Sequence, residues 1–470
     1  MRNADEAAQT LKVRRLHIDC AEMELVRNVT TNAERYTGSG YIDQDDAGMI
    51  IFRLYAATSE NTSAFERLQA LMINNAGMVF GVTDFFTLRA KDYSGSIWTA
   101  EHLLPNCAGW NLISPTEPSL PCWTGNIRIL TQSSRSCPSL TNSLSVHFFE
   151  DIALPLTDVS HTDIVSGGLT SKQLSRDYIE FEAANSRFHI AKTKEGFQVD
   201  VASDIPFPPD FEMRIIEALR FVTAYPLNWR IIVTRIAGQE VRRLSSEQKV
   251  TRATALQRPL SCDRYDAFTD FWGLFSKYLE YVINNSMNDE WNKCSVHLNQ
   301  ALEASANAAD AWAVALCIAV EGCASLVNWT ETPMAKTARK ALGRHVREHL
   351  KNTDSQGTDF EKRATGLIGM LANPRLQDRL SPLLADGWVN VEHIEAWKQL
   401  RHPGAHGTVL QFSGSDDNQF DAFLLKIHKV TMLMYHLCFY LIGYKGLQTN
   451  YGVPGWPTEP YPLPVSISTL

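Results

Sequence analysis

Residues 268–282 read Phe-Thr-Asp-Phe-Trp-Gly-Leu-Phe-Ser-Lys-Tyr-Leu-Glu-Tyr-Val, and the fold class depends on this stretch and its flanks. Apolar side chains recur in it every three or four residues, a spacing that places them on one face of a helix. The face consists of Phe268, Phe271, Leu274, Tyr278 and Val282. The pattern predicts an amphipathic helix that packs against other helices.

Helical patterns continue from this stretch toward the C-terminus. Asn390 is expected to cap a short helix whose apolar face carries Val391, Ile394 and Trp397. The longest apolar run, 430–443, is too short to span a bilayer and predicts a buried core helix. The other predicted helices span 289–306, 310–328, 333–351 and about 418–444.

Upstream of about Pro259 the pattern is typical of β-strands. Short apolar runs are separated by clusters of Gly, Pro, Ser, Asn and Asp. One helix is expected between Pro208 and Pro226, and residues 106–142 are expected to form a long loop around one short strand. The predicted strands are 11–18, 23–29, 49–55, 78–87, 126–130, 143–149, 178–182, 197–201 and 229–235.

These patterns predict an α+β protein. A β-rich domain over residues 1–260 is expected to precede an all-α bundle over 265–447, with a C-terminal tail at 448–470. The change of pattern falls near 245–265, and the polar run 242–258 is the expected linker.

Composition limits the classes of function. The chain has 470 residues and a formal net charge of −8, so two or three domains are expected and any RNA-binding surface must be local. The nine cysteines include no CxxC pair, and the N-terminus lacks a secretory pattern. Both features favour a reduced, cytoplasmic protein without membrane association.

The segment Gln399-Leu400-Arg401-His402-Pro403-Gly404-Ala405-His406-Gly407 carries the strongest chemical signal. Pro403 is expected to end a helix, and Gly404 frees the backbone to bend, so Arg401 and His406 can converge. Arg344 and His349 have the same spacing but lie within a predicted helix, where their side chains should diverge.

Arginine and histidine are suited to RNA cleavage without a metal ion. Histidine titrates near neutrality and can serve as acid or base, while arginine donates a fixed fork of hydrogen bonds to phosphate oxygens. The alternative is structural use, in which the arginine caps carbonyls and the histidine is a satisfied core residue.

The segment resembles the signature of the HEPN superfamily of helical ribonucleases, often Arg-Asn-x-x-Ala-His-Gly. Ala405-His406-Gly407 matches the end of that signature, and His402 stands where Asn is commoner. The resemblance implies a homodimer whose two Arg/His sets face each other across one cleft, with His402 as a hydrogen-bonding helper or a polar filler.

Glu321 lies among small and apolar residues of a predicted helix. Many HEPN domains carry a polar residue on a helix that faces the motif, and Glu321 resembles it, so it could orient Arg401 or His406. A solvent-facing glutamate explains the position equally well.

A basic helix follows at 333–351. Its cations could follow an RNA backbone, although a solvated helix face is the commoner explanation of such a run. The candidate RNA-binding residues are Lys336, Arg339, Lys340, Arg344 and Arg347, and Glu348 is the one acid among them.

Metal and cofactor sites are not expected. Cys294 and His297 lie about one helical turn apart, but no second pair of ligands accompanies them in the sequence. Phosphate-binding loops, dinucleotide fingerprints, zinc-protease motifs and nucleophile elbows are missing from the sequence.

The order of a large β-rich region and a HEPN domain resembles the ApeA-like abortive-infection proteins of bacteria. That resemblance implies a metal-independent endoribonuclease, acting on RNA such as tRNA in anti-phage defence and activated by a phage-derived trigger. The alternative is a non-catalytic HEPN module that binds RNA or a phage protein. A hydrolase in the N-terminal domain is a weaker third reading, because no nucleophile there has convincing spacing.

Overall fold

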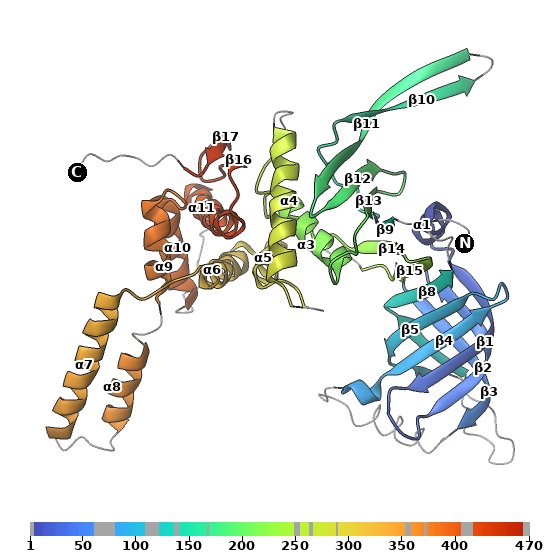
Figure 1. The fold of residues 1–470 in the computed structure, drawn as a ribbon, viewed down its shortest axis with the longest axis horizontal. Helices are drawn as coiled ribbons and strands as arrows, with labels where there is room; N and C mark the ends of the chain where they lie inside the picture. Colours follow the sequence, from blue (N-terminus) through green and yellow to red (C-terminus); the bar gives the residue numbers. More distant parts are fainter. Residues whose placement is uncertain are drawn as a thin grey trace. The chain divides into compact units, whose positions relative to one another are not determined.

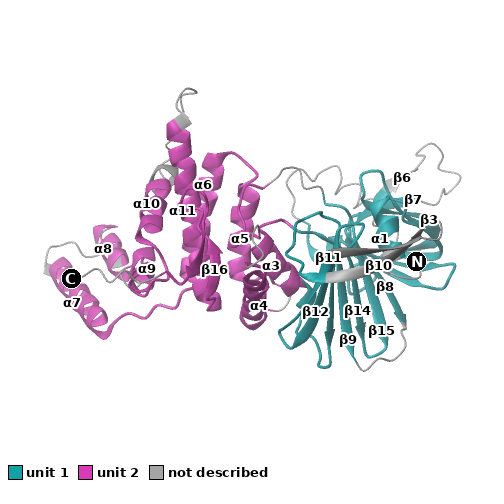
Figure 2. Cartoon of the chain, turned by 90° about the horizontal axis from the view of Figure 1, so that it is seen from above, with its two compact units in different colours: residues 1–212, 227–251 teal, residues 213–226, 252–470 magenta. Residues whose placement is uncertain are grey.

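The chain forms two compact units in a computed structural model (Figure 2). Unit 1 comprises residues 1–212 and 227–251, and unit 2 comprises 213–226 and 252–470. The segment 213–226 therefore belongs to the second unit although it lies within the first in sequence. The residues described are 4–60, 80–108, 122–135, 141–166, 169–248, 254–262, 267–287, 290–352, 359–370, 374–405 and 417–463.

Unit 1 is built on one large sheet (Figure 1). Its fifteen described strands run in the order β10-β11-β12-β13-β9-β14-β15-β8-β5-β4-β1-β2-β3-β7-β6, and the pairings are antiparallel. The strands are β1 (His17–Arg27), β2 (Arg35–Gln44), β3 (Ile50–Glu60), β4 (Phe86–Asp92), β5 (Ile97–Leu103), β6 (Asn106–Ala108), β7 (Cys122–Ile127), β8 (Ile129–Arg135), β9 (Asn142–Phe148), β10 (Asp158–Ser166), β11 (Leu169–Ala183), β12 (Ser186–Lys192), β13 (Phe197–Ser203), β14 (Trp229–Ile236) and β15 (Gln239–Ser245).

Alternation of buried and exposed side chains explains these strands. In β13, Phe197, Val199 and Val201 are buried while the residues between them are partly exposed. Trp98 and Trp123 are also buried, so both belong to the core of unit 1.

Several sequence predictions for unit 1 were wrong. Residues 11–18 are not a strand, because α1 (Ala4–Lys12) occupies the start and β1 begins at His17. A 3-10 turn (Val82–Asp84) breaks 78–87, and residues 78–79 lie outside the described residues. The predicted loop at 106–142 contains β6, β7 and β8, and the predicted linker begins inside β15. Polar strands such as β8 were not fully predicted, because backbone hydrogen bonds to the neighbouring strands stabilise them and their side chains carry little apolar pattern.

Unit 2 is a helical assembly with a small two-stranded sheet (Figure 1). The predicted α+β class is confirmed, because a helical region follows the large antiparallel sheet. The segment predicted as a C-terminal tail contains β17, which pairs with β16. Its elements are α3 (Phe211–Thr223, which begins in unit 1), α4 (Phe268–Asn285), α5 (Lys293–Ala304), α6 (Ala309–Ser325), α7 (Pro333–Asn352), α8 (Asp359–Met370), α9 (Leu376–Ala385), α10 (Val391–Ala405), α11 (Asp417–Ile442), β16 (Gly446–Thr449) and β17 (Thr458–Tyr461).

Helix α11 lies at the centre of unit 2. Its residues from Val430 to Phe439 are almost completely buried, which confirms the predicted core helix. Phe221 of α3 stacks on Tyr278 of α4 with ring centroids 4.1 Å apart, and this contact ties the inserted segment 213–226 to the bundle. Among the described residues, no helix combines the length and the apolarity needed to cross a bilayer.

Candidate functional site

Helix α10 positions Arg401. His393, Ala396, Trp397 and Leu400 are buried and occupy positions i, i+3, i+4 and i+7, so they form the inner face of the helix. This face packs against α6 and α11. The backbone N–H of Glu392 donates to Asn390 Oδ1 at 2.9 Å, which confirms the predicted cap.

Arg401 follows the last buried residue of that face and meets a carboxylate. Its Nε donates to Oε1 of Glu321, one turn from the end of α6. The guanidinium carbon also lies 5.5 Å from the ring centroid of Trp397, within the range of a cation–π contact. The structure thus brings together two residues that lie eighty positions apart in the sequence.

The ion pair is partly solvated. The side chains of Arg401 and Glu321 are 51% and 40% exposed, so the pair contributes at most about 1 kcal/mol to stability. Its effect is positional: a long arginine side chain is held in one place on the surface of unit 2.

The predicted break at Pro403 was wrong. Helix α10 includes Pro403 and Gly404 and ends at Ala405. Proline has a helical φ and removes only one backbone donor, so a helix already fixed by buried contacts can continue through it near its end. The backbone of His402 belongs to α10, and His406 lies outside the described residues.

Cys317 lies one turn before Glu321 on the buried side of α6. Burial, and then the nearby Glu321 carboxylate, raises the pKa of the Cys317 thiol to about 12. The thiol is therefore protonated near neutral pH and is a poor nucleophile.

The basic residues of α7 do not form one uniform set. Lys336, Lys340, Arg344 and Arg347 are exposed and lie within about 80° of one another around the helix. Arg339 instead forms a two-bond ion pair with Glu331, with both N–O distances at 2.8 Å. Glu331 precedes the helix and was therefore not considered in the sequence prediction. Because Arg339 pairs with Glu331, it is less available to RNA than the other basic residues of α7.

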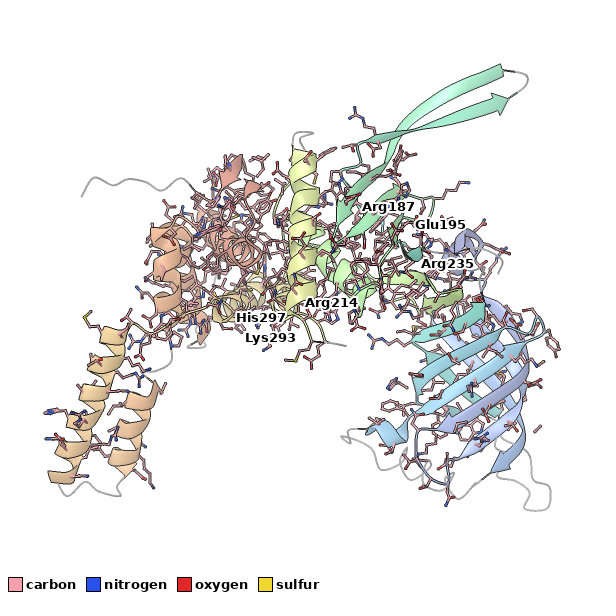
Figure 3. All side chains as sticks on the ribbon, viewed as in Figure 1. Arg187, Glu195, Arg214, Arg235, Lys293 and His297 are labelled. Atoms are coloured by element: carbon pink, nitrogen blue, oxygen red, sulfur yellow. The ribbon has the colours of Figure 1, made fainter. Side chains whose placement is uncertain are left out.

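A pocket on the sheet of unit 1 is a second candidate. It has a volume of about 690 Å³ and is lined by residues of β9 and β11–β14, including Arg187 and Arg235 (Figure 3). Ser145 Oγ, in its lining, lies 3.2 Å from Nε2 of His147, and Gln198 donates to the same oxygen. This pair was not predicted from the sequence, although alternation along β9 places residues 145 and 147 on one face.

Comparison with known proteins adds no assignment to either site. No family model matches the chain, and neither a curated protein nor a solved structure does so.

Acid should weaken the anchoring of α10. Burial, and then the charge of Lys429, lowers the pKa of His393 to about 4, and His436 lies 5.3 Å away between ring centroids. Below the unfolded-state pKa of about 6.5 the unfolded chain gains a proton that the folded chain excludes. Stability is therefore full above that pH and is lost as the pH falls toward 4.

Between pH 7 and pH 5, we expect the unfolding free energy of the wild type to fall by about 2 kcal/mol more than that of His393→Gln. Denaturant unfolding of the full chain at both pH values measures it. The exposed His345→Gln is the control and should keep the wild-type loss. An equal fall in unfolding free energy in the wild type and both variants would contradict a lowered pKa at His393.

Proposed function

We propose that unit 2 is a HEPN-like endoribonuclease that uses Arg401 and His406 and needs no catalytic metal ion. The observation that carries the proposal is the fixation of Arg401 at the surface by Glu321 and Trp397, five residues before His406. Transesterification of RNA requires at least a phosphate-binding cation and a titratable imidazole, and under this proposal His406 is the imidazole that acts beside Arg401.

The reaction is an attack of the 2′-OH on the adjacent phosphorus. The P–O2′ bond forms, the P–O5′ bond breaks, and the products are a 2′,3′-cyclic phosphate and a 5′-OH. One imidazole removes the 2′-OH proton while another protonates the 5′-oxygen. His406 from two copies of the chain would supply both groups in a homodimer, and His402 could assist by hydrogen bonding.

Arg401 would neutralise the charge that grows on the phosphate oxygens. Its contact with Glu321 uses Nε, and the two terminal nitrogens are the donors we assign to phosphate. Glu321 is then a positioning residue that orients the guanidinium.

This activity fits a cytoplasmic abortive-infection protein. Cleavage of RNA such as tRNA would stop translation in the infected cell. Under this proposal unit 1 senses a phage-derived trigger or restrains unit 2.

A non-catalytic RNA or phage-protein sensor is the second candidate. The observation that favours it is the continuation of α10 through Pro403 to Ala405, because the break that was expected to bring Arg401 and His406 together does not occur there. Stoichiometric RNA binding without products, in resting and triggered samples, would select this function.

Substitutions at the site test the nuclease proposal. We expect Arg401→Ala and His406→Ala each to lower the cleavage rate at least 100-fold, because each removes a transition-state interaction. Arg401→Lys should retain little activity since it loses the planar fork, and Glu321→Gln should lose about tenfold. The measurement is single-turnover cleavage of labelled total RNA by the purified full chain.

Lys398→Ala is the matched control. Lys398 lies on α10 three residues before Arg401 and pairs with Glu395 at 2.6 Å, so its loss should leave cleavage unchanged. Thermal unfolding of each variant reports on folding. Wild-type rates in folded Arg401→Ala or His406→Ala protein would refute the nuclease proposal.

The exposed face of α7 should contribute to RNA affinity. Lys340→Ala with Arg344→Ala should weaken binding of single-stranded RNA and flatten the dependence of log K on log salt by roughly 0.7 per lost phosphate contact. Arg339→Gln should change both quantities less, because Arg339 is already paired with Glu331. Titrations of the full chain at several salt concentrations measure the slopes. Equal slopes in the wild type and the Lys340→Ala, Arg344→Ala double variant would exclude α7 from the RNA surface.

A further inference from the structure

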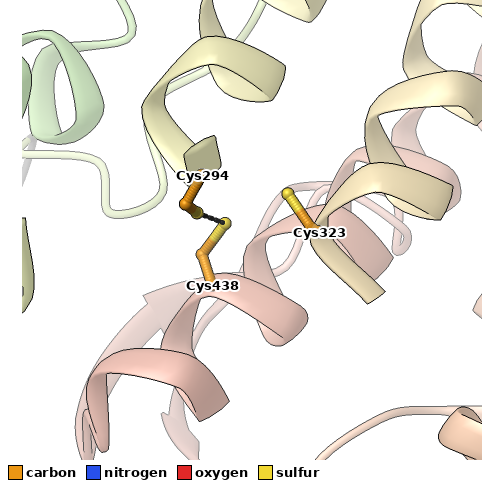
Figure 4. A group of neighbouring side chains, drawn as sticks. All are labelled: Cys294, Cys323 and Cys438. Carbon is orange, nitrogen blue, oxygen red and sulfur yellow. Dashed lines mark hydrogen bonds between the residues drawn. The ribbon is translucent and has the colours of Figure 1, made fainter. Parts of the chain in front are cut away.

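Three cysteines from three helices of unit 2 meet in its interior (Figure 4). Cys294 of α5, Cys323 of α6 and Cys438 of α11 are all fully buried, and their sulfur atoms lie within 4.8 Å of one another. Cys294 Sγ and Cys438 Sγ are 3.5 Å apart. The fold thus supplies the further ligands that Cys294 lacked in the sequence.

These separations match a metal ion better than a disulfide. Sulfur atoms bound to tetrahedral zinc at about 2.3 Å lie about 3.8 Å apart, whereas a disulfide requires about 2.05 Å. A disulfide would also join only two of the three sulfurs. Small side-chain adjustments bring all three to tetrahedral spacing.

A fourth donor lies on the same helix as Cys294. His297, labelled in Figure 3, follows it by one turn of α5, and its Nδ1 is buried without a hydrogen-bond partner among the described residues. Its ring nitrogens do not lie within 4.8 Å of all three sulfur atoms, so ligation requires a rotation of the His297 side chain. Its ring packs against Gly322: a Cβ atom there would lie 2.4 Å from His297 Nε2. Gly322 therefore makes room for the imidazole beside Cys323.

We propose that Cys294, Cys323 and Cys438 bind a structural Zn²⁺ ion, and that the His297 side chain turns toward the three sulfur atoms to become the fourth ligand. Three thiolates and one imidazole are a preferred zinc set, and full enclosure is typical of a structural rather than a catalytic site. Binding would replace the thiol protons and link α5, α6 and α11.

The site would also stabilise the surface contact with Arg401. Cys323 and Glu321 are two residues apart on α6, so an ion that fixes the inner side of this turn fixes the carboxylate on its outer side. The proposal does not depend on RNA cleavage, because its test reads metal content.

The test measures zinc in the full chain purified without chelators. We expect about one zinc ion per chain by elemental analysis, and its loss in Cys323→Ser and Cys438→Ser. Cys317→Ser is the matched control, because Cys317 is buried on the same helix but lies outside the cluster, and it should retain the ion.

Two further measurements keep the proposal falsifiable if the serine variants do not fold. Wild-type protein loaded with Co²⁺ should show the absorption of a tetrahedral cobalt–thiolate centre, and His297→Ala should alter that spectrum. Titration of wild-type thiols with a mercurial should release zinc. Folded wild-type protein without stoichiometric metal, or with a Cys294–Cys438 disulfide by mass spectrometry, would overturn the proposal, as would equal metal loss in Cys317→Ser.

Discussion

The packing of α10 against α6 is the constraint on which the candidate site depends. Four buried side chains on one face of α10 fix both its axial position and its rotation, and they leave Arg401 at the edge of that face. The ion pair with Glu321 follows from this arrangement. Since the pair is partly solvated, it does not drive the packing of the helices.

Helix α6 carries two kinds of chemistry on opposite sides. Glu321 is 40% exposed and reaches Arg401, whereas Cys323 is fully buried beside Cys294 and Cys438. Gly322 separates them and admits the ring of His297. Residues 321–323 thus connect the Arg401 contact at the surface of unit 2 to the cysteine cluster in its interior. We therefore expect a change at the cluster to alter the position of Glu321.

The sequence predicted the helices of unit 2 well because their apolar residues repeat at helical spacing, as in α4 and α11. It predicted the sheet of unit 1 less well, because polar strands such as β8 and β15 are held by backbone pairing that leaves no side-chain pattern. From the sequence, Glu321 was expected either to orient Arg401 or His406 or to face solvent, and the pattern did not decide between the two. The cysteine cluster was not predictable, because its members lie on three helices and share no local spacing. At Pro403, local propensity predicted the wrong boundary, since α10 includes Pro403 and Gly404.

The chemistry of the RNA ends is the most direct test of a metal-independent nuclease at Arg401 and His406. The purified full chain is incubated with RNA without any added divalent ion, and the termini of the fragments are identified. A metal-independent nuclease predicts 2′,3′-cyclic phosphate and 5′-hydroxyl ends, formed as fast as when a divalent ion is added. Fragments with 3′-hydroxyl and 5′-phosphate ends, formed only when a divalent ion is added, would contradict it.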